Sequence, residues 1–284
     1  MVSPVRRSLL AAAPAVAAAA ALGGLPRSAA AQAVTLAQIK ASGELRIGCE
    51  AAYVPFTYRQ DGKIVGYDVE LAELFCKSLG VKANFIDTAW AGVIPSLYAK
   101  KFDVIMSSMS YTKERLERVA FTIPYAEASQ ALLVRAADAD KIKAPADLNG
   151  RVLAVKLGSP GQVLQEKMAA TLKAAGGAGF KELRTFDDHP SAYVALAQNR
   201  VDGVLNTVPT LAMVLKDAPG KYAIVKGMGA DNWAGIAARK EDPEIVAFLN
   251  EELKKLKASG ALYALQEKWF GFRMTLADAV PSFS

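Results

Sequence analysis

Hydrophobic and polar residues follow one another in blocks that predict strands and helices in alternation along most of the chain. Short apolar runs predict buried strands, and longer stretches with apolar residues on one helical face predict amphipathic helices. The first round of predicted elements is a strand at 45–49, a helix at 68–79, a strand at 85–86, a helix at 94–99 and a strand at 102–106. This order is typical of a parallel sheet covered by helices.

A polar stretch at 134–146 interrupts the alternation, which then begins again. The second round consists of a strand at 152–155, a helix at 161–175, a strand at 183–186, a helix at 191–198 and a strand at 201–205. Asp242 and Pro243 then predict the start of a long helix at 243–258, and a last helix is expected around 262–270. Two successive α/β rounds predict a two-lobed α/β protein.

The first 33 residues differ from the rest and predict a secretory signal peptide. Arg6 and Arg7 precede an alanine-rich apolar run, and the candidate cleavage sites are Ala29-Ala30-Ala31 and Ala31-Gln32-Ala33. A membrane anchor is the alternative, but the run is dominated by alanine and contains Pro14. The mature chain is therefore expected in the periplasm, and the choice between the general and the twin-arginine export route stays open.

Charge and composition exclude several classes of function. Removal of Arg6, Arg7 and Arg27 with the leader lowers the formal charge from +6 to +3, and the remaining charges are interspersed. This argues against a nucleic-acid partner. The sequence contains no phosphate-binding loop, dinucleotide fingerprint or metal-ligand cluster, so no cofactor is expected. Cys49 and Cys76 either form a disulfide or remain as buried thiols, and the sequence does not decide between them.

Candidate ligand-binding residues gather where the predicted strands end. In open α/β sheets, ligands bind beyond the carboxyl ends of the strands. The candidates at these ends are Glu50, Tyr53, Ser107, Ser108, Ser110, Lys156, Ser159 and Thr207, and Trp90 joins them as an aromatic candidate. The two aromatic residues, Tyr53 and Trp90, either stack on a ligand or belong to the core.

Two features predict binding of an anion. Arg115 lies in the first turn of a helix predicted to begin at Lys113, and it has no opposite charge at helical spacing. Its guanidinium could hold a carboxylate at two points. Ser159 opens an S-x-x-Q capping box, with Pro160 at the first helical position. A surface arginine and an ordinary helix cap are the alternatives, but one such feature in each lobe favours a ligand held between the lobes.

The chain from about residue 43 to 270 resembles the family 3 extracellular solute-binding proteins, which serve amino-acid ABC transporters. The stretches that carry the resemblance are ELRIGCEAAYVPFTY, GKIVGYDVELAELFCKSLGV, WAGVIPSLYAKKFDVIMSSMSYTKER, VAFTIPY, DLNGRVLAVKLGS, NRVDGVL and LYALQEKWFG. They occur in the order and spacing of the family. The resemblance is strongest to binders of polar and basic amino acids.

This resemblance implies a type II periplasmic binding protein fold, with lobe 1 at 34–128 plus 231–284 and lobe 2 at 129–230. It also implies a monomer that holds an amino acid or a derivative in the cleft and delivers it to a membrane permease, without catalysis.

The resemblance further assigns roles to the candidate residues. Arg115 would bind the α-carboxylate, assisted by backbone N–H groups at Ser110 and near Pro160. Ser107 and Ser108 would contact the ammonium or the side chain. Tyr53 and Trp90 would flank the side chain of the ligand, and Glu50 would face a basic group on it.

Two positions depart from the family pattern. Thr207 stands where the family usually has an aspartate for the α-ammonium, and Pro160 lacks the amide that a hydroxyl residue would supply. A modified or unusual amino acid is therefore favoured over plain lysine, arginine or histidine.

An enzyme similar to cyclohexadienyl dehydratases and a sensor for a membrane receptor are the rival functions. His189, the single histidine, precedes Pro190 at a helix start, where a capping or surface role is expected.

Overall fold

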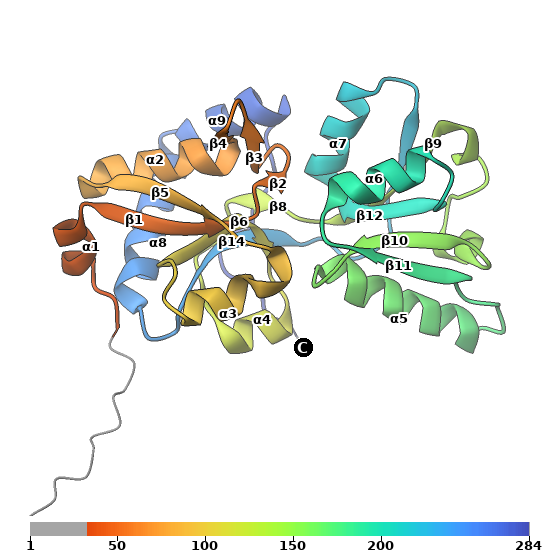
Figure 1. Cartoon of the computed structure of the whole chain (residues 1–284), viewed down its shortest axis with the longest axis horizontal. Helices are drawn as coiled ribbons and strands as arrows, with labels where there is room; N and C mark the ends of the chain where they lie inside the picture. The colour runs from red at the N-terminus through yellow and green to blue at the C-terminus, as the bar shows by residue number, and fades with distance from the viewer. Residues whose placement is uncertain (1–32, 284) are drawn as a thin grey trace, which may run out of the picture. The chain divides into compact units, whose positions relative to one another are not determined.

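The computed structural model describes residues 33–283, so the predicted signal peptide lies outside the described residues. Within the described part, no helix is both long and apolar enough to cross a membrane. Two open sheets form the framework (Figure 1).

The first sheet has the strand order β5-β1-β6-β14-β7, and β8 also pairs with β14. Its strands are β1 (Glu44–Cys49), β5 (Lys82–Asp87), β6 (Val104–Ser110), β7 (Ala120–Phe121), β8 (Ala126–Glu127) and β14 (Trp233–Ala238). β1 runs parallel to β5 and β6, whereas β14 runs antiparallel to its neighbours. The predicted strand at 102–106 extends further than expected, because β6 continues through three buried serines to Ser110.

The second sheet has the strand order β11-β10-β12-β9-β13. Its strands are β9 (Gln130–Arg135), β10 (Val152–Lys156), β11 (Glu182–Phe186), β12 (Gly203–Thr207) and β13 (Tyr222–Val225). β10 is parallel to β11 and β12, and β9 is antiparallel to β12 and β13. The interruption expected at 134–146 therefore begins inside β9, a strand that the sequence pattern did not predict.

Helices cover both faces of each sheet (Figure 1). They are α1 (Leu36–Ser42), α2 (Tyr67–Leu79), α3 (Val93–Tyr98), α4 (Lys113–Arg118), α5 (Pro160–Ala174), α6 (His189–Ala197), α7 (Val208–Asp217), α8 (Pro243–Ala258) and α9 (Ala261–Phe270). The short 3-10 turns are η1 (Trp90–Gly92), η2 (Ala136–Asp138) and η3 (Pro145–Leu148), and a small sheet contains β2 (Ala52–Tyr53), β3 (Thr57–Gln60) and β4 (Lys63–Val65). Apolar residues of α2, α8 and α9 pack on one face of the first sheet, and those of η1 and α3 pack on the other.

The structure shows the state of the two cysteines and the contacts of Asp242. Cys49 in β1 and Cys76 in α2 are both buried free thiols, so they do not form a disulfide. Asp242 stands at the N-cap position of α8, but its carboxylate does not cap the helix. It pairs with Arg239 at 2.6 Å and accepts a hydrogen bond from the Val34 amide.

The chain crosses between the two sheets twice, from β8 to β9 and from β13 to β14. The crossing segments are hydrogen-bonded to each other, because the Ala128 amide donates to the Asn232 carbonyl (2.8 Å) and the Asn232 amide donates to the Ser129 hydroxyl (3.2 Å). Two adjacent crossings place the carboxyl ends of β6, β10 and β12 around one cavity.

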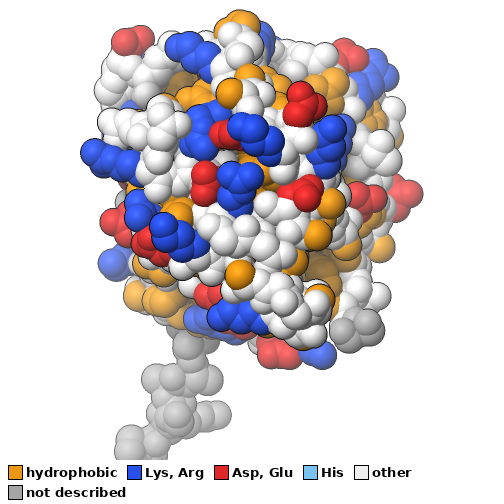
Figure 2. Space-filling model, turned by 90° about the vertical axis from the view of Figure 1, so that its right-hand side faces the viewer, with side chains coloured by type: hydrophobic (Ala, Val, Ile, Leu, Met, Phe, Trp, Pro, Cys, Tyr) orange, Lys and Arg blue, Asp and Glu red, His pale blue; other side chains and the backbone are white. Residues whose placement is uncertain are grey.

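The surface shown in Figure 2 carries acidic and basic side chains side by side. Ion pairs in the second sheet and its connections agree with this mixed pattern: Arg135 pairs with Asp138 and Asp202, and Arg184 pairs with Glu182. The interspersed charges predicted from the sequence are therefore present on this face.

Candidate functional site

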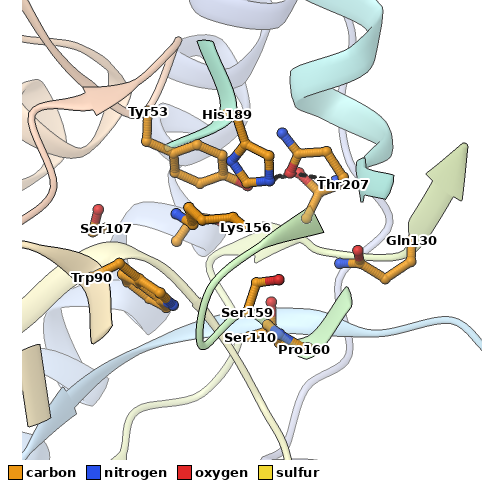
Figure 3. Close-up of a pocket in the computed structure, with 12 residues that line it drawn as sticks. Tyr53, Trp90, Ser107, Ser110, Gln130, Lys156, Ser159, Pro160, His189 and Thr207 are labelled. Atoms are coloured by element: carbon orange, nitrogen blue, oxygen red, sulfur yellow. Dashed lines mark hydrogen bonds between the residues drawn. The ribbon is translucent and has the colours of Figure 1, made fainter. Parts of the chain in front are cut away.

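A small cavity lies between the two sheets, and residues from both line it (Figure 3). Its lining consists of Tyr53, Trp90, Ser107, Ser108, Ser110, Gln130, Lys156, Ser159, Pro160, His189, Asn206 and Thr207. Polar atoms therefore surround a space that is flanked by two aromatic side chains. Such a mixture is typical of sites that bind small ligands.

The serines of β6 form one wall of the cavity. Ser107 is anchored, because its hydroxyl accepts from the Glu50 amide (3.2 Å) and contacts the Thr57 hydroxyl (3.1 Å). Ser108 adopts a left-handed backbone conformation with φ of 47°, which non-glycine residues seldom adopt. Its amide is held by Asp68 (3.1 Å) and by Tyr125 (2.9 Å), while its hydroxyl has no hydrogen-bond partner among residues 33–283.

Lys156 lies between the two aromatic side chains of the cavity (Figure 3). Its ammonium nitrogen is 4.9 Å from the ring centroid of Tyr53 and 4.7 Å from that of Trp90, within the range of cation–π attraction. The same ammonium forms an ion pair with Glu50, and both side chains are buried. Burial lowers the pKa of Lys156, and the neighbouring Glu50 carboxylate opposes this effect.

Arg115 of α4 is buried, with 7% of its surface exposed. Its guanidinium donates to the backbone carbonyls of Ser110 (2.9 Å) and Gly158 (3.2 Å) and lies 5.1 Å from the Trp90 ring centroid. The adjacent acid, Glu114, is exposed and pairs with another arginine of α4 instead. Burial lowers the pKa of Arg115 to about 10, so the group keeps its charge near neutral pH.

Ser159 caps α5 as the sequence predicted, because its hydroxyl accepts from the Gln162 amide (3.3 Å). The Gln162 side chain reaches back to the Gly158 amide (2.9 Å) rather than to Ser159 itself. Gly158 has φ of 70°, a conformation that favours glycine, and this turn directs its carbonyl toward Arg115 and the Trp90 indole. The turn before α5 therefore contacts both η1 and α4 through one carbonyl.

The opposite wall of the cavity contains Asn206 and Thr207 at the end of β12. The Thr207 hydroxyl contacts the Tyr53 hydroxyl (2.9 Å) and the Thr210 hydroxyl (3.1 Å). The Asn206 carboxamide oxygen accepts from the Thr207 amide (2.7 Å) and from the Tyr53 hydroxyl (3.3 Å). These oxygen atoms already take part in a local network, and none of them carries a negative charge.

His189 contradicts the surface role expected from the sequence. It is 5% exposed, lines the cavity, and stacks between Tyr53 (5.6 Å between ring centroids) and Tyr193 (6.1 Å). The cap of α6 is Asp188, whose carboxylate accepts from the Ser191 amide (2.8 Å). Burial lowers the pKa of His189 well below its ordinary value, so the imidazole is neutral near pH 7.

The candidates from the sequence converge on this cavity. Those that line it are Tyr53, Trp90, Ser107, Ser108, Ser110, Lys156, Ser159 and Thr207. The other two, Glu50 and Arg115, contact this lining from behind, through Lys156 and through Ser110 and Trp90.

Two other lining residues were not placed in the site from the sequence. Gln130 begins β9, a strand that was not predicted, and His189 was assigned to the surface. Asn206, which also lines the cavity, directly precedes Thr207 at a strand end where the sequence places candidate residues.

Comparison with known proteins gives a consistent picture. A family model for bacterial extracellular solute-binding proteins, family 3, matches residues 45–272. The L-cystine-binding protein TcyJ of Escherichia coli strain K12 is 30% identical over 84% of this chain and 87% of its own length. The L-arginine-binding protein of Pseudomonas aeruginosa is 32% identical over 84% of this chain and 92% of its own length.

Solved structures resemble the chain over most of its length. The ancestral amino acid-binding protein AncCDT-1, described as a precursor of cyclohexadienyl dehydratase, is 35% identical with a TM-score of 0.76, covering 83% of this chain and 99% of the other. A mutant of the protein ArgBP from T. maritima is also 35% identical, with a TM-score of 0.73 and the same coverage.

Proposed function

Because the chain belongs to the bacterial extracellular solute-binding proteins of family 3, we propose that it captures an amino acid or an amino-acid derivative and delivers it to an ABC transporter. The relatives described above are named as binding proteins for amino acids, and this supports the class of ligand. Delivery requires a permease in the membrane as the partner. The periplasm is the compartment in which such a protein would act.

The observation that carries the proposal is the environment of Arg115. A buried guanidinium that has no carboxylate partner among residues 33–283 lies beside the polar cavity, next to Ser110 and Trp90. Buried charges are normally paired, because desolvation is costly. A carboxylate on the solute would complete this pair with a bidentate contact.

We propose that binding closes two lobes, with lobe 1 at 34–128 plus 231–284 and lobe 2 at 129–230. The two crossing segments would act as the hinge, as a few residues between packed bodies often do. Trp90 and Arg115 both donate to the Gly158 carbonyl (3.1 and 3.2 Å), and these bonds would hold the closed form. A monomer is sufficient for this mechanism.

A catalytic function is the second candidate, since AncCDT-1 is described as a precursor of cyclohexadienyl dehydratase. A dehydratase needs a positioned acid. Glu50 contacts the cavity lining but is already paired with Lys156, and Asp68 reaches the lining only from behind, where its carboxylate accepts from the Ser108 amide. This arrangement favours binding without catalysis. Incubation with prephenate or arogenate, followed by an absorbance scan for product, tests the enzyme directly.

Thermal-shift screening against amino acids, their derivatives and small carboxylates tests the main proposal. A ligand present at 100 times its dissociation constant should stabilise the protein by about 2.7 kcal/mol. Calorimetry on protein stripped of bound solute then measures the affinity of each compound that shifts the melting temperature. If no compound in a broad panel stabilises the protein, solute capture of this class is contradicted. A neighbouring permease gene would argue against the sensor function.

A further inference from the structure

The place in the cavity that would suit a cationic group is occupied by a lysine of the chain itself. Two aromatic rings and one carboxylate surround this place, which we call the cation box: Tyr53, Trp90 and Glu50. Aromatic faces together with an acid favour a positive charge. The Lys156 ammonium lies within 5 Å of both ring centroids and pairs with the acid.

Among the described residues 33–283, the lining of the cavity contains no second carboxylate for a positive group. At the end of β12, the uncharged oxygens of Asn206 and Thr207 already bond to Tyr53, to Thr210 and to the backbone. His189 on the same wall is neutral, since burial lowers its pKa well below 6.5.

Two acids, Asp188 and Asp68, lie next to lining residues, and both already form hydrogen bonds with other groups. Asp188 caps α6 through the Ser191 amide. Asp68 lies behind Ser108 and is held by its amide and by Tyr125, and burial raises its pKa to about 7. A carboxylate in such a position is only partly ionised at neutral pH, and neither acid lines the cavity.

Two cations therefore meet at one indole. The Trp90 ring lies 5.1 Å from the Arg115 guanidinium carbon and 4.7 Å from the Lys156 nitrogen. Only one of these cations, Lys156, has an acidic partner among residues 33–283. A ligand with an additional positive charge would add a third cation at this point, and a buried cation without an acid is costly.

We propose that Lys156 is an internal counter-ion that fills the cation box, so that the cavity selects a solute with a carboxylate for Arg115 and no positive charge on its remaining body. The inference rests on the proposed function and specifies the ligand class. Suitable solutes are small carboxylates, or amino-acid derivatives that lack a free α-ammonium and have a neutral or acidic side group.

The test uses two matched pairs of probes and calorimetry on the stripped protein. L-arginine and L-citrulline have nearly the same shape but differ in side-chain charge. L-glutamine and 4-carbamoylbutanoate differ in the α-ammonium. We expect citrulline to bind at least about tenfold more tightly than arginine, which corresponds to about 1.4 kcal/mol. We also expect 4-carbamoylbutanoate to bind at least as tightly as glutamine.

The variant Lys156→Met should empty the cation box and leave Glu50 free. Arginine should then gain at least about tenfold in affinity over the wild type, while citrulline changes by less than about threefold. Lys173→Met removes the same charge from an exposed position on α5 and should leave both affinities unchanged. The double variant Glu50→Gln/Lys156→Met avoids an unpaired buried acid, and in it the gain for arginine should disappear.

The outcomes separate the inference from the proposed function. Wild-type protein that binds arginine as tightly as citrulline contradicts the inference and leaves solute capture intact. A folded Lys156→Met protein without a gain for arginine does the same. If none of the four probes binds either protein, the inference fails, and the proposed function is then judged by the broad thermal-shift panel alone. Melting curves show whether each variant is folded before its affinities are compared.

Discussion

Replacing Arg115 with methionine should abolish solute binding and leave the protein folded. Methionine keeps an apolar stem against Trp90 but removes the charge. Burial lowers the pKa of Arg115 well below its ordinary value, to about 10. This corresponds to a desolvation cost of about 3 kcal/mol, which the folded protein bears throughout the pH range below 10, where the group is charged.

Hydrogen bonds offset this cost in the absence of solute. The guanidinium donates to the carbonyls of Ser110 and Gly158, at 2.9 and 3.2 Å. Bonds from a charged donor contribute about 1.5–3 kcal/mol each. The two bonds together contribute about 3–6 kcal/mol against a cost of about 3 kcal/mol, so Arg115→Met should change the free energy of unfolding by about 3 kcal/mol or less. Urea denaturation of the solute-free protein measures this change.

The Arg115→Met substitution should weaken solute binding strongly. Loss of one partner of a buried, charge-assisted pair costs about 2–5 kcal/mol, because the carboxylate of the solute is left without a counter-charge. This corresponds to a loss of affinity of about 30- to 4,000-fold. Calorimetry with the tightest-binding of the four probes measures it. Arg118→Met is the matched control, because Arg118 lies on the same helix but is exposed and pairs with Glu114.

The result that would refute this reasoning is an Arg115→Met protein that binds within about threefold of the wild type. A variant that loses stability by more than about 4 kcal/mol without solute would also contradict it, because Arg115 would then be a structural cation. Equal losses of affinity in Arg115→Met and Arg118→Met would point to a general electrostatic effect rather than to a direct contact.

Three further predictions concern other parts of the chain. Burial raises the pKa of Asp68 to about 7, above its unfolded value of 3.8, so the folded state should lose up to about 4 kcal/mol of stability as the pH rises from 4 to 7. Asp68→Asn should flatten this part of the curve, and parallel denaturation curves for the two proteins would contradict the idea. Thr207→Asp should improve binding of glutamine relative to 4-carbamoylbutanoate by about tenfold, and an unchanged ratio would show that no ammonium approaches this position. Intact-mass measurement on a periplasmic extract should find a chain that begins near Gln32 or Val34, whereas a full-length chain would contradict export.

The sequence pattern predicted the elements whose signals are local. α2 and α8 have apolar residues at helical spacing, and their predicted ends agree with the structure within a residue or two. β1 and β10 are short apolar runs in an alternating context. In these segments, local preference and tertiary packing favour the same conformation, and periodicity was therefore sufficient.

Elements that depend on distant partners were missed. β14 (Trp233–Ala238) consists mainly of alanine and glycine, which have little preference for strands. It is a strand because it pairs with β6, more than a hundred residues earlier in the chain. β9 was not predicted for a similar reason. Its apolar residues lead directly into a charged connection, and its partners, β12 and β13, come much later in the chain.

The candidate residues could be found from strand ends, but their interactions could not. Glu50 and Lys156 are separated by 106 positions, and no local signal indicates that they pair. The sequence therefore suggested that Glu50 would face a basic ligand. In the structure, the ammonium of Lys156 takes that place. His189 shows the same limit, because it stacks on Tyr53 of β2, which is distant in the sequence, although its other aromatic neighbour, Tyr193, lies one turn further along α6.

A comparison of two buried arginines separates a structural charge from a functional one. Arg239 is fully buried, yet it donates to the Leu97 and Phe102 carbonyls, both at 2.8 Å, and pairs with Asp242 at 2.6 Å. Its charge is therefore neutralised within the chain. Arg115 has two carbonyl contacts as well but no acid among residues 33–283, although pairing would reduce the cost of its burial. Folding alone does not explain why Arg239 has an acidic partner and Arg115 has none. The unpaired guanidinium of Arg115 lies beside the polar cavity between the sheets. The missing negative charge is then most simply supplied from outside, by the carboxylate of the solute.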